Sequence, residues 1–204
     1  MTGQPQQAVV LVHGLWMSGW TWHFYHRWLT QQGYKVYLFS YKTTRQSFDL
    51  TLLQLTAFVN SRPERIIHLV VHSMGGILAM QALPKIKKSG KLVMLGSPIN
   101  GSKVAKKLKK IGWHKGLLNH ATEPLTQGTG AVVKQRDSLM IAGTSPYGFG
   151  RLIESRMGVS DGTVGLAETQ ADWLDEHVQI HCNHMGLLWN KKAMNLTLKF
   201  LKNS

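Results

Sequence analysis

Ser73 lies in the stretch LVVHSMGG (Leu69–Gly76), directly after a run of apolar residues and just before two glycines. An apolar run that ends in a glycine-containing turn predicts a strand, a sharp turn and a helix, and such a turn presents a serine hydroxyl as a nucleophile. The pattern typical of this turn, G-x-S-x-G, has a glycine two positions before the serine, where this chain has Val71. The stretch predicts a nucleophilic Ser73 in a turn that must accommodate valine. We expect His72, beside it, to be a packing residue.

A serine hydroxyl needs a base within hydrogen-bond reach and a third group that orients the base. Of the ten histidines, His184 is best placed because it follows the last predicted strand; His181, expected inside that strand as a core residue, is the alternative. Asp161, in the turn VSDGTVG, is the predicted acid, and Glu154 is the other carboxylate offered by this part of the chain. The chain order Ser73, Asp161, His184 is the order expected for a serine on a strand–turn–helix.

Acyl transfer also needs hydrogen-bond donors for the negative oxygen of the intermediate. The N–H of Met74 is predicted to be one donor, because it begins the helix after the serine. We assign the second to the N–H of Leu15, in the glycine-containing loop after the first strand. Trp16 and Trp20, in the aromatic stretch that follows, are predicted substrate contacts. We expect neither a metal nor an organic cofactor, since no ligand cluster or phosphate-binding loop is present.

Short apolar runs alternate with helical patterns along the 204 residues. This alternation predicts an α/β fold with a mostly parallel sheet flanked by helices, in which ligands bind beyond the carboxyl ends of the strands. The predicted strands are Ala8–His13, Lys35–Tyr41, Arg65–His72, Lys91–Ser97, Asp137–Gly143 and His177–Cys182. The predicted helices are Thr21–Gln32, Gln46–Ser61, Met74–Lys88, Gly165–Asp175 and Asn190–Lys202.

Positive charge is concentrated in one part of the chain, which has a net charge of +14. Residues 65–122 contain eleven Lys or Arg and no Asp or Glu. Residues 101–130 are predicted to form a short basic lid or cap, in which Val104, Leu108 and Ile111 recur at helical spacing among lysines. Such a helix could rest on an anionic membrane surface, or pack on its own domain with a solvated basic face. Nucleic-acid binding is disfavoured, because no recognition motif accompanies the charge.

Several segments together resemble the α/β-hydrolase superfamily, and within it small bacterial serine lipases and esterases. They are VVLVHGLW, LVVHSMGGILA, LVMLGSPINGS, SDGTVG and HVQIHCNHMGLLW, which extend from about Ala8 to the C-terminus. The resemblance implies an α/β-hydrolase fold in one domain, residues 1–204, with the lid-like insertion at about 101–130. Val71 is the departure from the family pattern. Some small lipases carry alanine in place of the glycine, and valine is larger still.

The sequence therefore predicts a serine hydrolase that cleaves carboxylic esters with apolar acyl groups through an acyl-enzyme. The alternatives are an acyl-thioesterase, or an inactive hydrolase fold that binds anionic membranes or nucleic acid through its lysines. The first residues, MTGQPQQ, show no signal peptide, and no apolar run could span a bilayer. The single cysteine, Cys182, cannot form an internal disulfide. We expect a soluble cytoplasmic protein.

Overall fold

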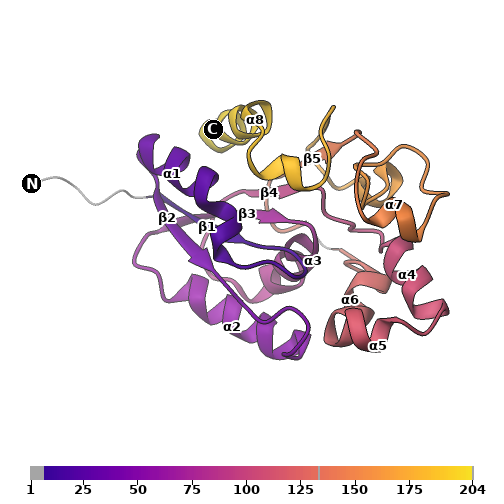
Figure 1. Cartoon of the computed structure of the whole chain (residues 1–204). Coiled ribbons are helices and arrows are strands. Elements are labelled where there is room, and N and C mark those ends of the chain that lie inside the picture. Colours follow the sequence, from indigo (N-terminus) through magenta and orange to yellow (C-terminus); the bar gives the residue numbers. More distant parts are fainter. Residues whose placement is uncertain (1–6, 133, 204) are drawn as a thin grey trace, which may run out of the picture.

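Six parallel strands form one sheet in the order β2-β1-β3-β4-β5-β6 (Figure 1). The computed structural model describes residues 7–132 and 134–203; residues 1–6, on which the prediction about a signal peptide rests, lie outside the described part. The strands are β1 (Gln7–Val12), β2 (Lys35–Phe39), β3 (Ile66–His72), β4 (Leu92–Leu95), β5 (Ser138–Gly143) and β6 (Glu176–Ile180). This parallel sheet confirms the α/β fold predicted from the alternating apolar and helical patterns.

Helices cover both faces of the sheet (Figure 1). Helices α1 (His23–Gln31) and α8 (Lys191–Lys202) pack on one face, against residues such as Leu11 and Ile141. Helices α2 (Phe48–Asn60) and α3 (Met74–Ala82) pack on the other, against residues such as Val10 and Leu69. Because successive side chains of a strand point to opposite faces, strands buried on both sides must be apolar at almost every position.

The strand order reverses between the neighbouring strands β1 and β3. The chain leaves β1 toward β2 on one side of the sheet and leaves β3 toward β4 on the other. In the register of this pair, Val12 lies beside Val71, so the two strands end at the same edge. Such a reversal leaves a crevice beyond the carboxyl ends of the strands, where ligands of open α/β sheets bind. The loop after β1 and the turn that contains Ser73 meet there.

Two predicted helices are shorter than expected. The segment 165–175 contains only a 3₁₀ turn, η4 (Leu166–Thr169), because the Asn100 side chain takes the carbonyls of Ala167 and Gln170 as hydrogen-bond acceptors, at 3.1 and 2.7 Å. These carbonyls are then bonded to another segment instead of to their own helix. Helix α3 ends at Ala82, ahead of the 3₁₀ turn η2 (Leu83–Lys85), because Pro84 has no N–H to continue it.

Residues 101–130 form a group of short helices beside the sheet edge (Figure 1). They are α4 (Lys103–Lys110), α5 (His114–Leu117), the 3₁₀ turn η3 (Asn119–Ala121) and α6 (Thr122–Gln127). On α4 the buried residues are Ala105 and Leu108, with Val104 half-buried. The predicted apolar stripe is wrong at its end, since Ile111 is exposed just past the helix.

The short helix α7 (Gly150–Ile153) lies between β5 and β6 in the chain, and the 3₁₀ turns η1 (Gly19–Trp22) and η5 (Met185–Leu188) follow the first and last strands. Within the described ranges, no helix has the length and apolar character needed to cross a membrane.

Candidate active site

Ser73 occupies the turn between β3 and α3 in a backbone conformation that few non-glycine residues adopt, with φ 55° and ψ −127°. Its N–H donates a hydrogen bond of 2.9 Å to the carbonyl of Leu95 at the end of β4. A non-glycine residue at positive φ costs of the order of 1–3 kcal/mol, and such strain occurs where function requires it. The strand, sharp turn and helix around Ser73 are as the sequence predicts, and the role of Ser73 as a nucleophile stays a prediction.

Val71 fits this elbow without crowding it. A Cβ on Gly75 would lie 2.7 Å from the carbonyl oxygen of Val12 and 2.8 Å from that of His13, so glycine is required there by the end of β1. None of the three atoms nearest that Cβ belongs to Val71. Val71 itself is fully buried in the core on the α2 and α3 face. The close approach that restricts this turn thus involves the β1 backbone, and a valine in β3 does not obstruct it.

Asp161 and His184 form a buried hydrogen-bonded pair. The carboxylate Oδ2 of Asp161 accepts a bond of 2.6 Å from Nδ1 of His184. The other oxygen, Oδ1, accepts from the backbone N–H groups of Thr163 (2.9 Å) and Val164 (2.7 Å). Because Nδ1 is the donor, Nε2 of His184 keeps a free lone pair and can accept a proton. The alternative base, His181, lies beyond the end of β6 and is exposed, so the expectation that it is a core residue inside the strand is wrong.

His72 links the nucleophile turn to the histidine loop. Its Nε2 donates a hydrogen bond of 3.1 Å to the backbone carbonyl of His184, and the two imidazole rings lie 4.5 Å apart between centroids. Burial holds the pKa of His72 well below its usual range, with a smaller contribution from the neighbouring His184. His72 is therefore a neutral donor at physiological pH. The sequence places it beside Ser73, but only the structure shows this contact across 112 positions of the chain.

A cavity of about 310 Å³ opens beside these residues, at the lower end of the range of about 300–1,000 Å³ that is typical of small-molecule pockets. Ser73 and His184 both line it, although no hydrogen bond among the described residues joins the serine hydroxyl to the imidazole. Catalytic hydrogen bonds are often looser before a substrate is bound. The other walls are largely apolar and include Leu108, Leu125 and Ile153.

The loop after β1 is fixed by His13. Nε2 of His13 accepts a bond of 3.1 Å from the N–H of Tyr41, and Nδ1 donates one of 2.9 Å to the carbonyl of Gly14. The Tyr41 hydroxyl donates to the His13 carbonyl at 3.0 Å, and the two rings stack. These contacts hold the next residue, Leu15, at the wall of the cavity. Its N–H and that of Met74 remain the predicted oxyanion donors.

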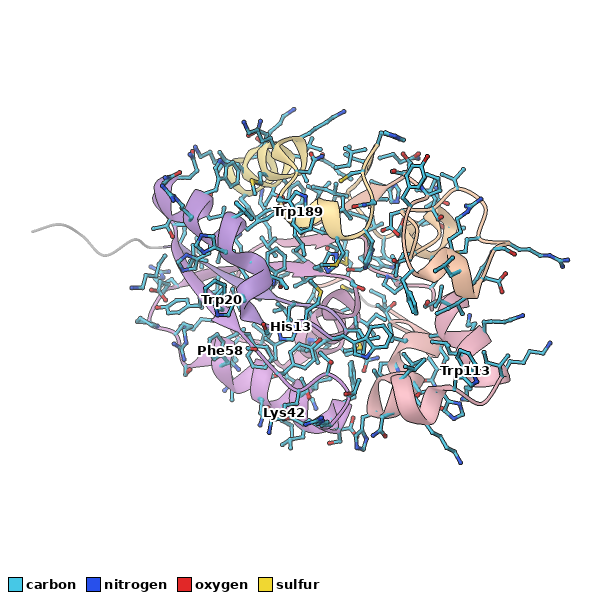
Figure 2. All side chains as sticks on the ribbon, in the orientation of Figure 1. His13, Trp20, Lys42, Phe58, Trp113 and Trp189 are labelled. Atoms are coloured by element: carbon cyan, nitrogen blue, oxygen red, sulfur yellow. The ribbon has the colours of Figure 1, made fainter. Side chains whose placement is uncertain are left out.

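The structure brings Trp16 to the cavity but not Trp20. Trp16 lines the wall, and its indole Nε1 donates to the carbonyl of Leu117 at 2.9 Å. Trp20 (labelled in Figure 2) is 84% exposed. Its ring stacks on His23. Within the turn η1, Trp22 is buried in the core and Trp20 points to solvent. In the described part of the chain, no group of three or more His, Cys, Asp or Glu side chains could hold a metal ion.

The fold is that of an α/β hydrolase. The model of the alpha/beta hydrolase family matches residues 9–193, and the chain belongs to this family. A comparison with curated proteins finds no match.

Solved structures of similar fold include lipases and esterases. A lipase from Bacillus licheniformis, BlEst2 in its mature form, is 19% identical with a TM-score of 0.76, covering 95% of this chain and 91% of the lipase. Polyneuridine aldehyde esterase is 15% identical with a TM-score of 0.65, covering 96% and 99%. A variant of tomato methylketone synthase I in complex with β-ketoheptanoate is 15% identical with a TM-score of 0.60, covering 98% and 99%. At these identities the likeness supports the shared fold.

Proposed function

We propose that this protein is a serine hydrolase that cleaves carboxylic esters with apolar acyl groups. Ser73 is the nucleophile, His184 the general base and acid, and Asp161 the group that orients His184. The observation that carries the proposal is the buried Asp161–His184 pair at a largely apolar cavity that Ser73 also lines. Membership of the alpha/beta hydrolase family and the lipase and esterase neighbours support it.

The proposed reaction proceeds through an acyl-enzyme. The Ser73 hydroxyl attacks the ester carbonyl as Nε2 of His184 takes its proton, and the backbone N–H groups of Leu15 and Met74 bind the negative oxygen of the tetrahedral intermediate. His184 then gives the proton to the departing alcohol, which leaves an acyl group on Ser73. A water molecule, deprotonated by the same imidazole, attacks this acyl group and releases the carboxylic acid.

The cavity favours an apolar acyl group over a charged one. Side chains from α4, α6 and α7 form its walls, among them Leu108, Leu125 and Ile153. Burying an apolar chain against such walls stabilises the complex by about 25 cal/mol for each Å² removed from water. A charged group placed there would lose its hydration without gaining a partner.

A fluorophosphonate probe, which reacts covalently with activated serines, tests the proposal directly. We expect the wild-type protein to be labelled, and the Ser73→Ala variant to be unlabelled while it keeps the melting temperature of the wild type. A well-folded wild-type protein that stays unlabelled would support an inactive hydrolase fold instead. Rates on soluble esters of increasing acyl length, each compared with its thioester, then define the leaving group and the length that the cavity accepts.

A further inference from the structure

Large apolar side chains surround the mouth of the cavity and remain exposed to solvent. Tyr147 and Phe149, in the loop before α7, both line the cavity, yet they are 77% and 60% exposed. Trp16 and Met185 line it from other loops and are exposed as well. Leu152, on α7 itself, is 83% exposed and is not part of the wall. Large exposed apolar side chains that gather around one cavity are typical of a binding site for a partner or a membrane.

Helix α4 lies against α7 (Figure 1) and carries positive charge beside the cavity. Its inner side supplies Ala105 and Leu108 to the cavity wall, and its outer side carries five exposed lysines. Residues 101–130 contain six lysines and one acidic residue, Glu123, which pairs with Lys109 at 2.6 Å. Exposed Trp113 follows the helix and lies at the same end of the molecule (Figure 2).

We infer that this surface, here called the mouth face, docks on an anionic phospholipid bilayer. The mouth face consists of the exposed apolar residues around the cavity and the outer lysines of α4: Trp16, Tyr147, Phe149, Leu152, Met185, Lys103, Lys106, Lys107, Lys109 and Lys110. Apolar and aromatic side chains enter the boundary between headgroups and acyl chains, and neighbouring lysines bind the headgroup phosphates. Docking in this way would place the cavity mouth against the lipid.

Charge and chemistry favour this occupant over two others. A second copy of the chain would bring the same lysines face to face, in a protein whose net charge is already +14. The phosphates of a nucleic acid would pair with the lysines. Leu152 and Phe149 would gain no apolar contacts and would remain exposed to water. An anionic bilayer complements both kinds of side chain at once.

Flotation of the full-length protein with vesicles tests the inference. We expect binding to vesicles of phosphatidylcholine mixed with phosphatidylglycerol, weaker binding at high salt, and little binding to phosphatidylcholine alone. The triple variant Lys106→Gln, Lys107→Gln, Lys110→Gln should bind about a hundredfold more weakly, at about fivefold for each lysine. Leu152→Ser should bind about tenfold more weakly, because an apolar side chain is withheld from the bilayer.

Matched controls separate the mouth face from the overall charge. Lys192→Gln, Lys199→Gln, Lys202→Gln removes the same charge from α8, which packs on the sheet with α1 and away from the cavity, and Leu53→Ser removes an exposed leucine from α2. Both controls should bind vesicles as the wild type does. Equal losses of vesicle binding in the α8 and α4 variants would overturn the inference. So would a wild-type protein that binds no better when phosphatidylglycerol is present, or one that binds duplex DNA more tightly than these vesicles. Ser73→Ala should bind vesicles like the wild type. Vesicle binding is therefore tested independently of the proposed catalytic activity.

Discussion

Replacing Asp161 by asparagine separates the proposed chemistry from the fold. Two backbone N–H groups, of Thr163 and Val164, donate to Oδ1 of Asp161. In Asp161→Asn the amide oxygen must keep that position, because backbone donors require an acceptor there. The amide NH₂ group then faces Nδ1 of His184, which must now accept a hydrogen bond. The imidazole proton therefore moves to Nε2, and Nε2 can no longer take a proton from Ser73.

The expected loss of activity is large, and the expected loss of stability is small. Where a triad aspartate has been changed to asparagine, kcat falls about 10⁴-fold, which corresponds to about 5 kcal/mol of transition-state stabilisation. The free energy of unfolding should fall by only about 1–2 kcal/mol, since a charge-assisted bond becomes a neutral one and the bonds to Oδ1 remain. Hydrolysis of a soluble short-chain p-nitrophenyl ester measures kcat and KM, and urea unfolding measures stability.

A matched control removes a carboxylate elsewhere. Asp172 is exposed, so Asp172→Asn should leave kcat, KM and stability unchanged. An Asp161→Asn variant that keeps its fold and a kcat within about tenfold of the wild type would refute the reasoning, because a histidine with the wrong tautomer cannot serve as the base.

Three more changes probe the residues around this pair. Val71→Gly should leave kcat and KM of the folded protein unchanged but lower the free energy of unfolding by about 3 kcal/mol, because it empties a buried strand position; a large loss of kcat would contradict the view that the elbow accommodates valine without a functional role for it. His72→Phe should lower kcat about tenfold with KM unchanged, because a buried carbonyl loses its donor, and His72→Gln should restore it; equal kcat in both variants would argue against a positioning role. Burial, with the nearby Arg136 and Lys91, lowers the pKa of His68 to about 4 from 6.5, so the unfolded chain binds the proton first and stability should fall by about 3 kcal/mol as the pH drops from 6.5 to 4. Urea unfolding across this range should show a weaker dependence on pH for His68→Gln, and an unchanged slope would exclude His68 as its source.

The sheet was predictable from the sequence because its signals are local. Strands covered on both faces must be apolar at almost every position, so β1, β3 and β5 stand out as nearly continuous apolar runs, interrupted in the middle of β3 by His68. The turn at Ser73 was predictable for the same reason, since its glycines and the flanking strand and helix are adjacent in the chain. The C-terminal end of α3 was not predicted correctly, because the apolar pattern continues beyond Pro84, the residue that ends the helix.

Other features depend on contacts that no local pattern encodes. Segment 165–175 has a helical composition, but the Asn100 side chain competes for its carbonyls. Trp16 and Trp20 lie in one aromatic stretch, yet only Trp16 lines the cavity, while Trp20, in η1, is exposed. The donor bond from His72 to the His184 carbonyl could not be inferred, because a histidine beside a buried serine is equally compatible with simple packing.

The loops that carry Asp161 and His184 are joined by their backbones as well as by their side chains. The N–H of His184 donates to the carbonyl of Asp161 at 2.9 Å, and the N–H of Ser145, after β5, donates to the carbonyl of Cys182 at 3.1 Å. Any residues could make these bonds, so the loops would meet without the carboxylate and the imidazole. The Asp161–His184 side-chain bond is therefore not required to bring the loops together, and it supports the proposed role of the pair in proton transfer. That division is why a change at Asp161 that keeps the backbone bonds can report on chemistry alone.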